Sequence, residues 1–334
     1  MSDATPNPIL VEVQRGSMAE SYHRGAIVVV NSNGTVLHSW GNANKLVYPH
    51  SSIKSIQALS LLESGAYKAF NLGPEEIALA CASHTGEAMH TELAQKWLRK
   101  IEEQEEVLAC GSHAPLDKKT RQKLFASQNK PTAVHNTCSG KHLGFITTAK
   151  HLGIDPKGYA MRSHPVQKMA EKTLSELSHS KLTDQQSGID GCGIPVVSIP
   201  LYNLALAMAN FVSPNCLSEK RRVAAEMIIN AKRSHPTLVG GNQKLCSRLM
   251  KHCPNLIVKD GNEGVYTAAL PDKRIGIALT IDDGSLKAAD VAITNLLKVL
   301  DVIPTGVENE FKNDLKPEIR NFTRTLTGHM QAIF

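Results

Sequence analysis

Hydrophobic positions near the start of the chain gather in two short runs that are typical of strands. Residues 26–30 read Ala-Ile-Val-Val-Val, and residues 35–40 read Thr-Val-Leu-His-Ser-Trp. Asn33-Gly34 lies between these runs and is a strong signal for a type I′ turn, because both central positions of that turn need a positive φ. The pattern predicts a β-hairpin over residues 25–40.

Helical spacing follows the predicted hairpin. The apolar positions of residues 51–63 recur about every three residues, which predicts a helix that ends at Ser64-Gly65. Residues 87–106 predict a second helix. The middle of the chain, from about residue 118 to 252, is expected to be mainly helical.

The end of the chain returns to strands. Three apolar runs predict them, at residues 255–259, 265–270 and 274–281, and residues 286–300 predict a closing helix. The connections between these strands are too short for parallel crossovers, so we expect antiparallel neighbours. The expected fold class is therefore α/β of the α+β kind, with a mixed or antiparallel central sheet and flanking helices. Both ends of the chain would contribute to this sheet, in a single domain over residues 8–332.

Composition and charge exclude several classes of protein. The 334 residues include 37 basic and 31 acidic side chains, a formal net charge of +6. The basic residues fall in short scattered groups without interleaved aromatic residues, so nucleic-acid binding is not expected. No run of about 18 apolar residues is present, so no membrane helix is expected. The first residues lack the basic and apolar regions of a secretory signal, which makes the cytoplasm the expected location.

The cysteines are the first sign of chemistry. There are seven of them, an odd number, and they form no C-x-x-C pair. In a cytoplasmic protein this pattern argues against structural disulfides and leaves the thiols for burial, metal binding or catalysis. We interpret four of them as small buried hydrophobic residues: Cys110, Cys216, Cys246 and Cys253.

Ser51-Ser-Ile-Lys54 matches the S-x-x-K pattern at the start of a predicted helix. Residues three apart share a helical face, so the lysine amine can reach the serine hydroxyl. A lysine can act as the base for such a serine when burial or a nearby cation lowers its pKa. The alternative is an ordinary helix start with a capping serine and an exposed lysine, and the local sequence does not decide between the two.

Three further segments concentrate reactive side chains. They are Cys81-Ala-Ser-His84, the stretch from His135 to His142, and Asp190-Gly-Cys192 among its neighbouring glycines. Cys138 and His142 have an acceptable spacing for two metal ligands, whereas Lys141 is by itself a poor ligand, because its amine must first lose a proton. A plain turn is the alternative for the first and third segments, and the sequence alone does not show whether Cys192 joins Cys138.

A second lysine lies beside a glycine at the end of a predicted strand. Lys259-Asp-Gly261 follows the apolar run Leu256-Ile-Val258. This position is compatible with a second active-site amine. The alternative is an exposed lysine of no catalytic use.

Together these segments resemble the rhizobial-type, class 3 L-asparaginases, also called the thermolabile asparaginase II family. The resemblance covers nearly the whole chain, and several matches in order are far more specific than any single one. The matching segments are His23-Arg-Gly-Ala26, Ser51-x-x-Lys54, Cys81-Ala-Ser-His84, Cys138-Ser-Gly-Lys-His142, Asp190-Gly-Cys192, His235-Pro236 and Lys259. The resemblance implies a fold like that of serine β-lactamases and penicillin-binding proteins, and a homodimer.

The resemblance also implies an activity, the hydrolysis of L-asparagine to L-aspartate and ammonia. It implies two serine–lysine pairs, Ser51 with Lys54 and Ser83 with Lys259. We expect Ser51 to be the nucleophile and Lys54 its base, while Ser83 and Lys259 polarise the site and transfer protons. The serine would attack the side-chain amide, ammonia would leave, and water would hydrolyse the aspartyl ester. Backbone N–H groups near the helix start would hold the oxyanion.

A zinc ion is implied as well. Its ligands would be Cys138, Lys141 and Cys192, with water completing a tetrahedron. This ion would shape the substrate pocket and would not activate the attacking water. Asp190 is expected to bind the α-amino group of the substrate, with Lys141 beside it.

One position departs from the family pattern. The family often has arginine directly before the S-x-x-K serine, where this chain has His50. An arginine there would hold the α-carboxylate of the substrate, so His50 is expected to make this recognition weaker and dependent on pH. His84 completes the expected substrate-binding residues.

Three rival functions remain at this point. One is a serine amidohydrolase that acts on glutamine or on a β-lactam, which turnover with each substrate would reveal. Another is a zinc hydrolase whose metal-bound water attacks directly, which chelation would inactivate while a Ser51→Ala variant stayed active. The third is a zinc-stabilised binding protein without catalysis, which would release no ammonia.

Overall fold

The computed structural model describes residues 6–334, which separate into two compact units. The first unit contains the residues up to 52 together with 198–212 and 252–334, and the second contains residues 53–197 and 213–251. Each unit therefore combines segments that are far apart in the sequence. The expectation of one domain over residues 8–332 stays a prediction.

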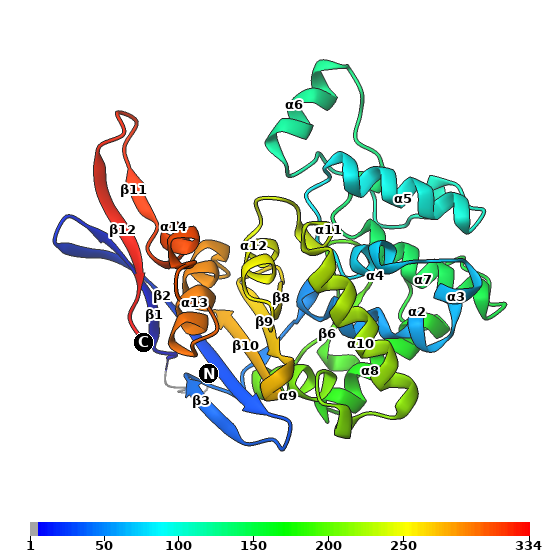
Figure 1. Ribbon diagram of the computed structural model, residues 1–334, viewed down its shortest axis with the longest axis horizontal. Coiled ribbons are helices and arrows are strands. Elements are labelled where there is room, and N and C mark those ends of the chain that lie inside the picture. The colour runs from blue at the N-terminus through cyan, green and yellow to red at the C-terminus, as the bar shows by residue number, and fades with distance from the viewer. Residues whose placement is uncertain (1–5) are drawn as a thin grey trace. The chain divides into compact units, whose positions relative to one another are not determined.

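An eight-stranded sheet forms the first unit (Figure 1). Seven strands follow the order β11-β12-β1-β2-β10-β9-β8, and β3 pairs with β2. All of these pairings are antiparallel. The strands are β1 (Ile9–Arg15), β2 (Met18–Asn31), β3 (Val36–Trp40), β8 (Ile257–Asp260), β9 (Val265–Leu270), β10 (Ile275–Ile281), β11 (Glu318–Arg320) and β12 (Leu326–Ala332). A separate short pair joins β4 (Leu46–Val47) to β7 (Ile199–Pro200).

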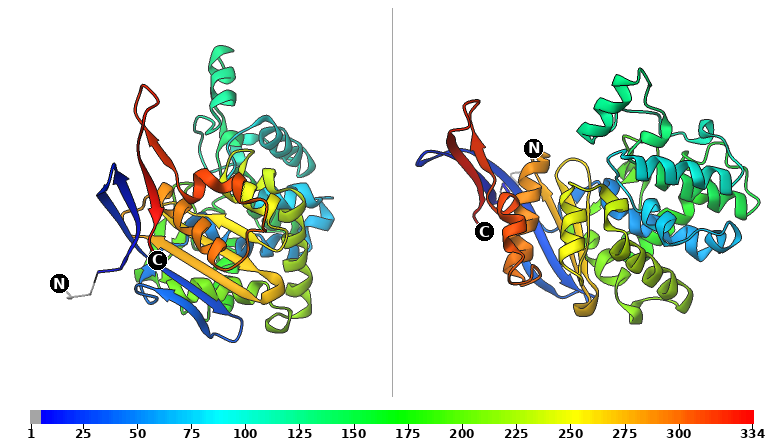
Figure 2. Two further views of the ribbon diagram at one scale, coloured as in Figure 1. Left: turned by 60° about the vertical axis from the view of Figure 1, so that its left-hand side comes forward. Right: turned by 45° about the horizontal axis from the view of Figure 1, so that its top comes forward.

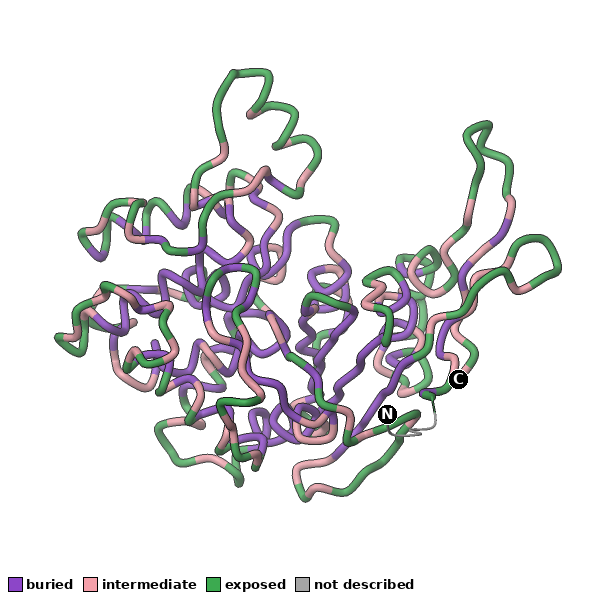
Figure 3. Tube along the Cα trace, turned by 180° about the vertical axis from the view of Figure 1, so that it is seen from behind, coloured by how far each residue is buried: buried purple, intermediate pink, exposed green. Residues whose placement is uncertain are grey.

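Helices cover both faces of the central strands. Every residue of β9 is buried, which requires cover on each face of the sheet. Helix α9 (Leu201–Phe211) packs against β10 and β2, and α13 (Leu286–Val299) packs on the other face, with the short α14 (Lys312–Leu315) beside it (Figures 1, 2 and 3). Gly276 of β10 permits the close approach of α9, since a Cβ there would lie 2.0 Å from the carbonyl oxygen of Ala205.

These observations confirm the predicted fold class, a mixed α/β arrangement with an antiparallel sheet and flanking helices. The early hairpin, the three late antiparallel strands and the closing helix are present. The sequence patterns missed β1, β11 and β12. These strands form the outer part of the sheet. β11 and β12 contain few apolar residues and give a weak signal, whereas β1 contains the apolar run Ile9-Leu-Val11, which the patterns left out.

The second unit is mainly helical. Its helices are α1 (Lys54–Gln57), α2 (Leu59–Glu63), α3 (Ala66–Ala69), α4 (Pro74–Ala80), α5 (Ala88–Lys100), α6 (Lys118–Ala126), α7 (Ser139–His151), α8 (Pro165–Ser178), α10 (Glu219–Ser234), α11 (Pro236–Gly240) and α12 (Leu245–His252). The strands β5 (Ser187–Ile189) and β6 (Pro195–Val197) form a small hairpin. Helix α7 is the core of this unit, because residues 139–149 are all buried and α7 packs against α2, α3, α4, α5 and α8.

Two predicted helices differ from the structure. The helix expected over residues 51–63 is divided into a 3₁₀ turn at His50–Ile53, then α1 and α2. Its serines bind nearby carbonyl groups, as the hydroxyl of Ser60 donates to the carbonyl of Gln57 at 3.0 Å, and such bonds compete with a regular helix. Its predicted end at Ser64-Gly65 is confirmed.

The helix expected over residues 87–106 ends early, at Lys100. Glu102 adopts a left-handed conformation with a φ of 54°, which terminates the helix. Four glutamates follow within residues 102–106. Their like charges would repel one another on a helix and would oppose the negative end of its dipole, so the chain turns before them.

Two further expectations concern the burial of four cysteines and the absence of a membrane helix. Cys110, Cys246 and Cys253 are buried as predicted, but Cys216 is exposed, because it ends a 3₁₀ turn that starts at Pro214 on the surface. Within residues 6–334, no helix has the length and the apolar character needed to cross a membrane.

Candidate functional site

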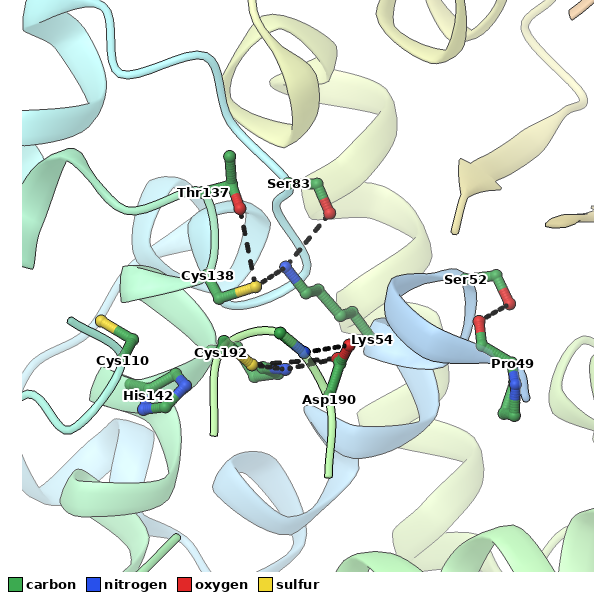
Figure 4. Close-up of polar contacts among 12 residues, drawn as sticks. Pro49, Ser52, Lys54, Ser83, Cys110, Thr137, Cys138, His142, Asp190 and Cys192 are labelled. Carbon is green, nitrogen blue, oxygen red and sulfur yellow. Dashed lines mark hydrogen bonds and ion pairs between the residues drawn. The ribbon is translucent and has the colours of Figure 1, made fainter. Parts of the chain in front are cut away.

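A buried lysine at the start of α1 is the centre of a polar cluster in the second unit (Figure 4). The Lys54 side chain is fully buried. Its Nζ donates to Ser83 Oγ at 3.1 Å, to Cys138 Sγ at 3.3 Å, and to the carbonyl oxygen of Ala82. The structure therefore connects the lysine of the S-x-x-K pattern to a serine and a cysteine from two other segments.

Local backbone structure brings Ser83 to this lysine. The chain leaves α4 at Cys81 and continues without regular structure past Ser83. The N–H of Ser83 donates to the carbonyl of Val239 in α11 at 2.9 Å, and the Ser83 side chain is buried. Ser83 is therefore held by α11 through its backbone N–H and by Lys54 through its hydroxyl.

Two thiols, an amine and a carboxylate lie beside Lys54 in the same unit. Cys138 precedes α7, and Lys141 belongs to the first turn of that helix. Lys141 Nζ lies 3.0 Å from Cys192 Sγ and 3.8 Å from Asp190 Oδ2. The sulfur of Cys192 also lies 3.8 Å from Asp190 Oδ2. Four residues that the sequence marked separately thus form one buried cluster.

A tight turn between β5 and β6 presents Asp190 and Cys192. The N–H of Asp190 donates to the carbonyl of Ile194 at 2.8 Å, and the N–H of Gly193 donates to the carbonyl of Asp190 at 2.8 Å. Gly193 has a φ of 85°, a conformation that glycine adopts without strain. The glycines of this segment therefore serve the turn that directs both side chains inward.

Ser51 and Lys259 belong to the first unit. Ser51 is buried in the 3₁₀ turn that begins at His50. Lys259 is buried near the end of β8, and its Nζ donates to Asp260 Oδ1 at 2.6 Å and to the Asp260 carbonyl at 2.9 Å. Each predicted serine–lysine pair thus combines a residue of the first unit with one of the second. The two pairs stay predictions.

His50 also belongs to the first unit, in a backbone conformation that few side chains adopt. Its φ is 47°, in the left-handed region. Its ring lies at a tilt of 54° to that of Tyr48, with the two ring centres 6.1 Å apart. The role expected for His50 in substrate recognition stays a prediction.

Comparison with known proteins places this sequence in a family. A sequence profile described as L-asparaginase II matches residues 11–332. The chain belongs to the L-asparaginase II family. The matched range contains every residue of the cluster around Lys54. A search of curated protein sequences gives no match.

Solved structures that are similar to this asparaginase II family chain share little sequence with it. Mglu in its glutamate form is 13% identical with a TM-score of 0.48, and the match covers 85% of this chain and 62% of the longer Mglu chain. The β-lactamase Mb2281c from Mycobacterium bovis is 15% identical with a TM-score of 0.44, over 83% and 95% of the two chains. The D-alanine carboxypeptidase AmpC from Burkholderia cenocepacia is 14% identical with a TM-score of 0.37, over 81% and 93%.

In this member of the asparaginase II family, the pKa values of the two clustered thiols are shifted in opposite directions. The pKa of Cys138 lies well below its usual value, because Cys192 donates a hydrogen bond to it and because Lys54 and Lys141 are close. The same hydrogen bond and burial raise the pKa of Cys192. Burial by itself lowers the pKa of Lys141, but both sulfurs and Asp190 outweigh this and raise it above its usual value. These shifts favour the thiolate form of Cys138 and the ammonium form of Lys141.

His84 supports the segment that carries Ser83. The N–H of Gly86 donates to His84 Nδ1 at 3.1 Å, so Nε2 carries the hydrogen and donates to Ser139 Oγ at 2.8 Å. The ring stacks on His90 with the two centres 4.8 Å apart. Burial first, and then the charge of His90, hold the pKa of His84 well below its usual value. His84 is therefore a neutral group whose ring nitrogens are both bound within the protein.

Tyr159 is a member of the site region that the sequence did not reveal. Its hydroxyl accepts from the N–H of Ala109 at 2.9 Å and therefore donates to His142 Nδ1, 2.5 Å away. Burial and the charge of Lys141 lower the pKa of His142 to about 3, so its ring is neutral. A single tyrosine after a glycine has no motif that could have identified it.

The residues expected to bind zinc lie together in the second unit, and the metal itself stays a prediction. The described part of the chain contains no group of three or more His, Cys, Asp and Glu side chains placed for a metal. The expected ligands are of a different composition, two thiols and one amine, and they converge in the buried cluster of Cys138, Lys141 and Cys192. Thiolates suit zinc, and the lowered pKa of Cys138 favours that form. The raised pKa of Lys141 works the other way, because its amine must lose a proton before it can bind a metal. When bound, zinc would supply a positive charge at the cluster of Cys138, Lys141 and Cys192.

Proposed function

We propose that this chain is an L-asparaginase of the rhizobial, class 3 type, which hydrolyses L-asparagine to L-aspartate and ammonia through a serine activated by lysine. Membership of the L-asparaginase II family supports amidohydrolase chemistry. The observation that carries the proposal is the buried contact of 3.1 Å between Lys54 Nζ and Ser83 Oγ. A zinc ion, a cytoplasmic location and a homodimer belong to the same proposal.

Lys54 and Ser83 form the proton-transfer part of the proposed reaction. Ser51, three residues before Lys54, remains our proposed nucleophile, and the neutral amine of Lys54 takes the proton of its hydroxyl. The serine oxygen bonds to the amide carbon of the substrate, the carbon–nitrogen bond breaks, and the nitrogen leaves as ammonia with the proton that Lys54 returns through Ser83. Water then hydrolyses the aspartyl ester and regenerates Ser51.

Substrate recognition is proposed to use the charged groups of the same cluster. Asp190 is a buried carboxylate that lies 3.8 Å from Lys141 Nζ. A carboxylate suits an α-ammonium group, and a nearby ammonium suits an α-carboxylate, so the pair complements the two charged ends of a free amino acid. This supports an amino-acid amide as substrate and disfavours an uncharged amide.

Substrate comparison is the first test. Purified zinc-loaded protein would be assayed for ammonia release from L-asparagine and from L-glutamine, and for hydrolysis of a chromogenic β-lactam. We expect turnover of asparagine to exceed that of the other two. If neither amide releases ammonia, the proposed function is refuted. If glutamine or the lactam is turned over faster than asparagine, that compound replaces asparagine as the proposed substrate.

Single substitutions test the roles. Lys54→Met removes the base, and we expect kcat to fall by about 100-fold or more. Ser51→Ala should abolish the covalent aspartyl intermediate seen by mass spectrometry after a rapid acid quench. Ser60→Ala is the control, because Ser60 is a buried serine of α2 whose hydroxyl binds only helix backbone in the described contacts. Full activity of Ser51→Ala, together with complete loss on chelation, would favour a zinc hydrolase.

A further inference from the structure

The second unit buries one more lysine that the proposed reaction does not use. Lys232 lies near the end of α10, and its side chain is fully buried. Its Nζ donates to the hydroxyl of Ser55, also buried, at 3.0 Å. A buried cation is costly unless polar groups bind it. This contact therefore constrains strongly how α10 lies against the helix that carries Ser55.

Ser55 directly follows the proposed base. Consecutive side chains on a helix point about 100° apart. Lys54 therefore contacts Ser83 and Cys138, while Ser55 accepts from α10 on a different side of α1. Helix α1 has only the four residues Lys54–Gln57, so its own backbone hydrogen bonds cannot fix its direction. The contact with Lys232 provides a second attachment point.

The same stretch of chain also holds Ser83. Helix α10 is followed at once by α11, which packs against α4. The carbonyl of Val239 in α11 accepts from the N–H of Ser83 at 2.9 Å, and the carbonyl of Thr237 is 3.0 Å from His90 Nε2. Residues 232–239 thus bind both sides of the proposed proton-transfer contact. They hold Lys54 through its neighbour Ser55, and they hold Ser83 through its backbone N–H.

We propose that Lys232 is a positioning residue of the enzyme, which sets the distance between Lys54 and Ser83 by joining α1 to the segment that holds Ser83. It touches none of the reacting atoms. The inference rests on the proposed function, because it gives the Lys54–Ser83 contact a catalytic use. It extends that function by adding a residue outside the motifs that identify the family.

Two substitutions remove the contact from opposite sides. Lys232→Met keeps an unbranched side chain in the buried position but removes the donor, and Ser55→Ala removes only the acceptor. A displacement of about 1 Å at a catalytic group can cost 100-fold, so we expect each to lower kcat for asparagine at least about tenfold. The KM for asparagine should change less than about twofold, since the role proposed for Lys232 concerns Lys54 and Ser83 and not the substrate-binding pair. Lys232→Arg retains a cationic donor and should recover part of kcat.

Coupling and structure complete the test. The double variant Lys232→Met/Ser55→Ala should be no slower than either single variant, because both remove the same contact. Ser60→Ala controls for loss of a buried serine. If Lys232→Met does not fold, Ser55→Ala carries the same comparison. In a crystal structure of either folded variant, we expect the Lys54 Nζ–Ser83 Oγ distance to exceed 3.5 Å.

The outcomes separate this inference from the proposed function. A wild-type protein that releases no ammonia from asparagine refutes the function, and the crystal structures then still decide whether Lys232 sets the contact. An active wild type whose kcat is unchanged in Ser55→Ala and in folded Lys232→Met overturns the inference alone. Additive effects in the double variant, or an unchanged Lys54–Ser83 distance in the variant structures, would overturn it as well.

Discussion

Replacing Gly140 by alanine would test how the contact between α4 and α7 positions the site. Gly140 lies in the first turn of α7, directly before Lys141. A Cβ at this position would lie 2.1 Å from the carbonyl oxygen of Leu79 and 2.6 Å from its carbonyl carbon. Leu79 belongs to the last turn of α4, and the chain continues from there to Ser83. The substitution therefore acts on both sides of the cluster.

The expected magnitude follows from these distances. Non-bonded heavy atoms prefer a separation of about 3.5 Å, so the first turn of α7 must move more than about 1 Å from α4. Overpacking of this kind costs about 1–3 kcal/mol of unfolding free energy, against a gain of about 0.5–1 kcal/mol from replacing a helical glycine. The movement carries Cys138 and Lys141 away from Ser83, and a shift of about 1 Å can lower kcat by about 100-fold.

Gly144→Ala is the matched control, one turn later on the same helix. A Cβ there would lie 3.8 Å from the Cβ of Ala80 and 3.9 Å from a methyl group of Leu61, which is ordinary contact. Urea unfolding should show Gly144→Ala as stable as the wild type or slightly more stable, and Gly140→Ala as less stable. Ammonia release should be normal in the first and low in the second. Equal unfolding midpoints and equal kcat in the two variants would refute the reasoning.

Three further predictions concern metal binding, pH and hydrogen bonding in the second unit. Cys192→Ala should reduce bound zinc from about one ion per chain to a small fraction, measured by plasma emission spectrometry, and unchanged zinc would contradict the proposed ligand set. Because the pKa of buried His84 is lowered in the folded state, the unfolded state binds more protons as pH falls through about 6.5, and stability is lost in that direction. His84→Asn should make this pH dependence shallower by at most about 1.4 kcal/mol per pH unit in urea unfolding, and identical slopes would count against a neutral His84. Thr147→Val removes the acceptor of the buried Trp97 Nε1–H at 3.0 Å, so thermal unfolding should report a loss of about 1–3 kcal/mol, and an unchanged midpoint would show that the bond contributes nothing.

Local patterns predicted much of the fold, because the elements concerned are formed by neighbours in the chain. The hairpin of β2 and β3 surrounds the Asn33-Gly34 turn, and β9 and β10 are joined by a connection of only four residues, 271–274. The pattern failed where local chemistry competed with it. Serine hydroxyls interrupted the helix over residues 51–63, and a run of glutamates ended the helix that begins at Ala88.

Residue types and their order along the chain were sufficient to indicate a family, an amide-hydrolysing chemistry and the segments that carry it. They did not determine which side chains meet. Lys54 contacts Ser83 and Cys138, which are 29 and 84 residues away, and Lys232 reaches Ser55 over 177 residues. Such contacts depend on how α1, α4, α7 and α10 pack together, and that packing follows from the burial of many apolar side chains at once. The positions of Tyr159 and Lys232 could therefore be found only in the tertiary structure, since neither residue carries a local signal of its role.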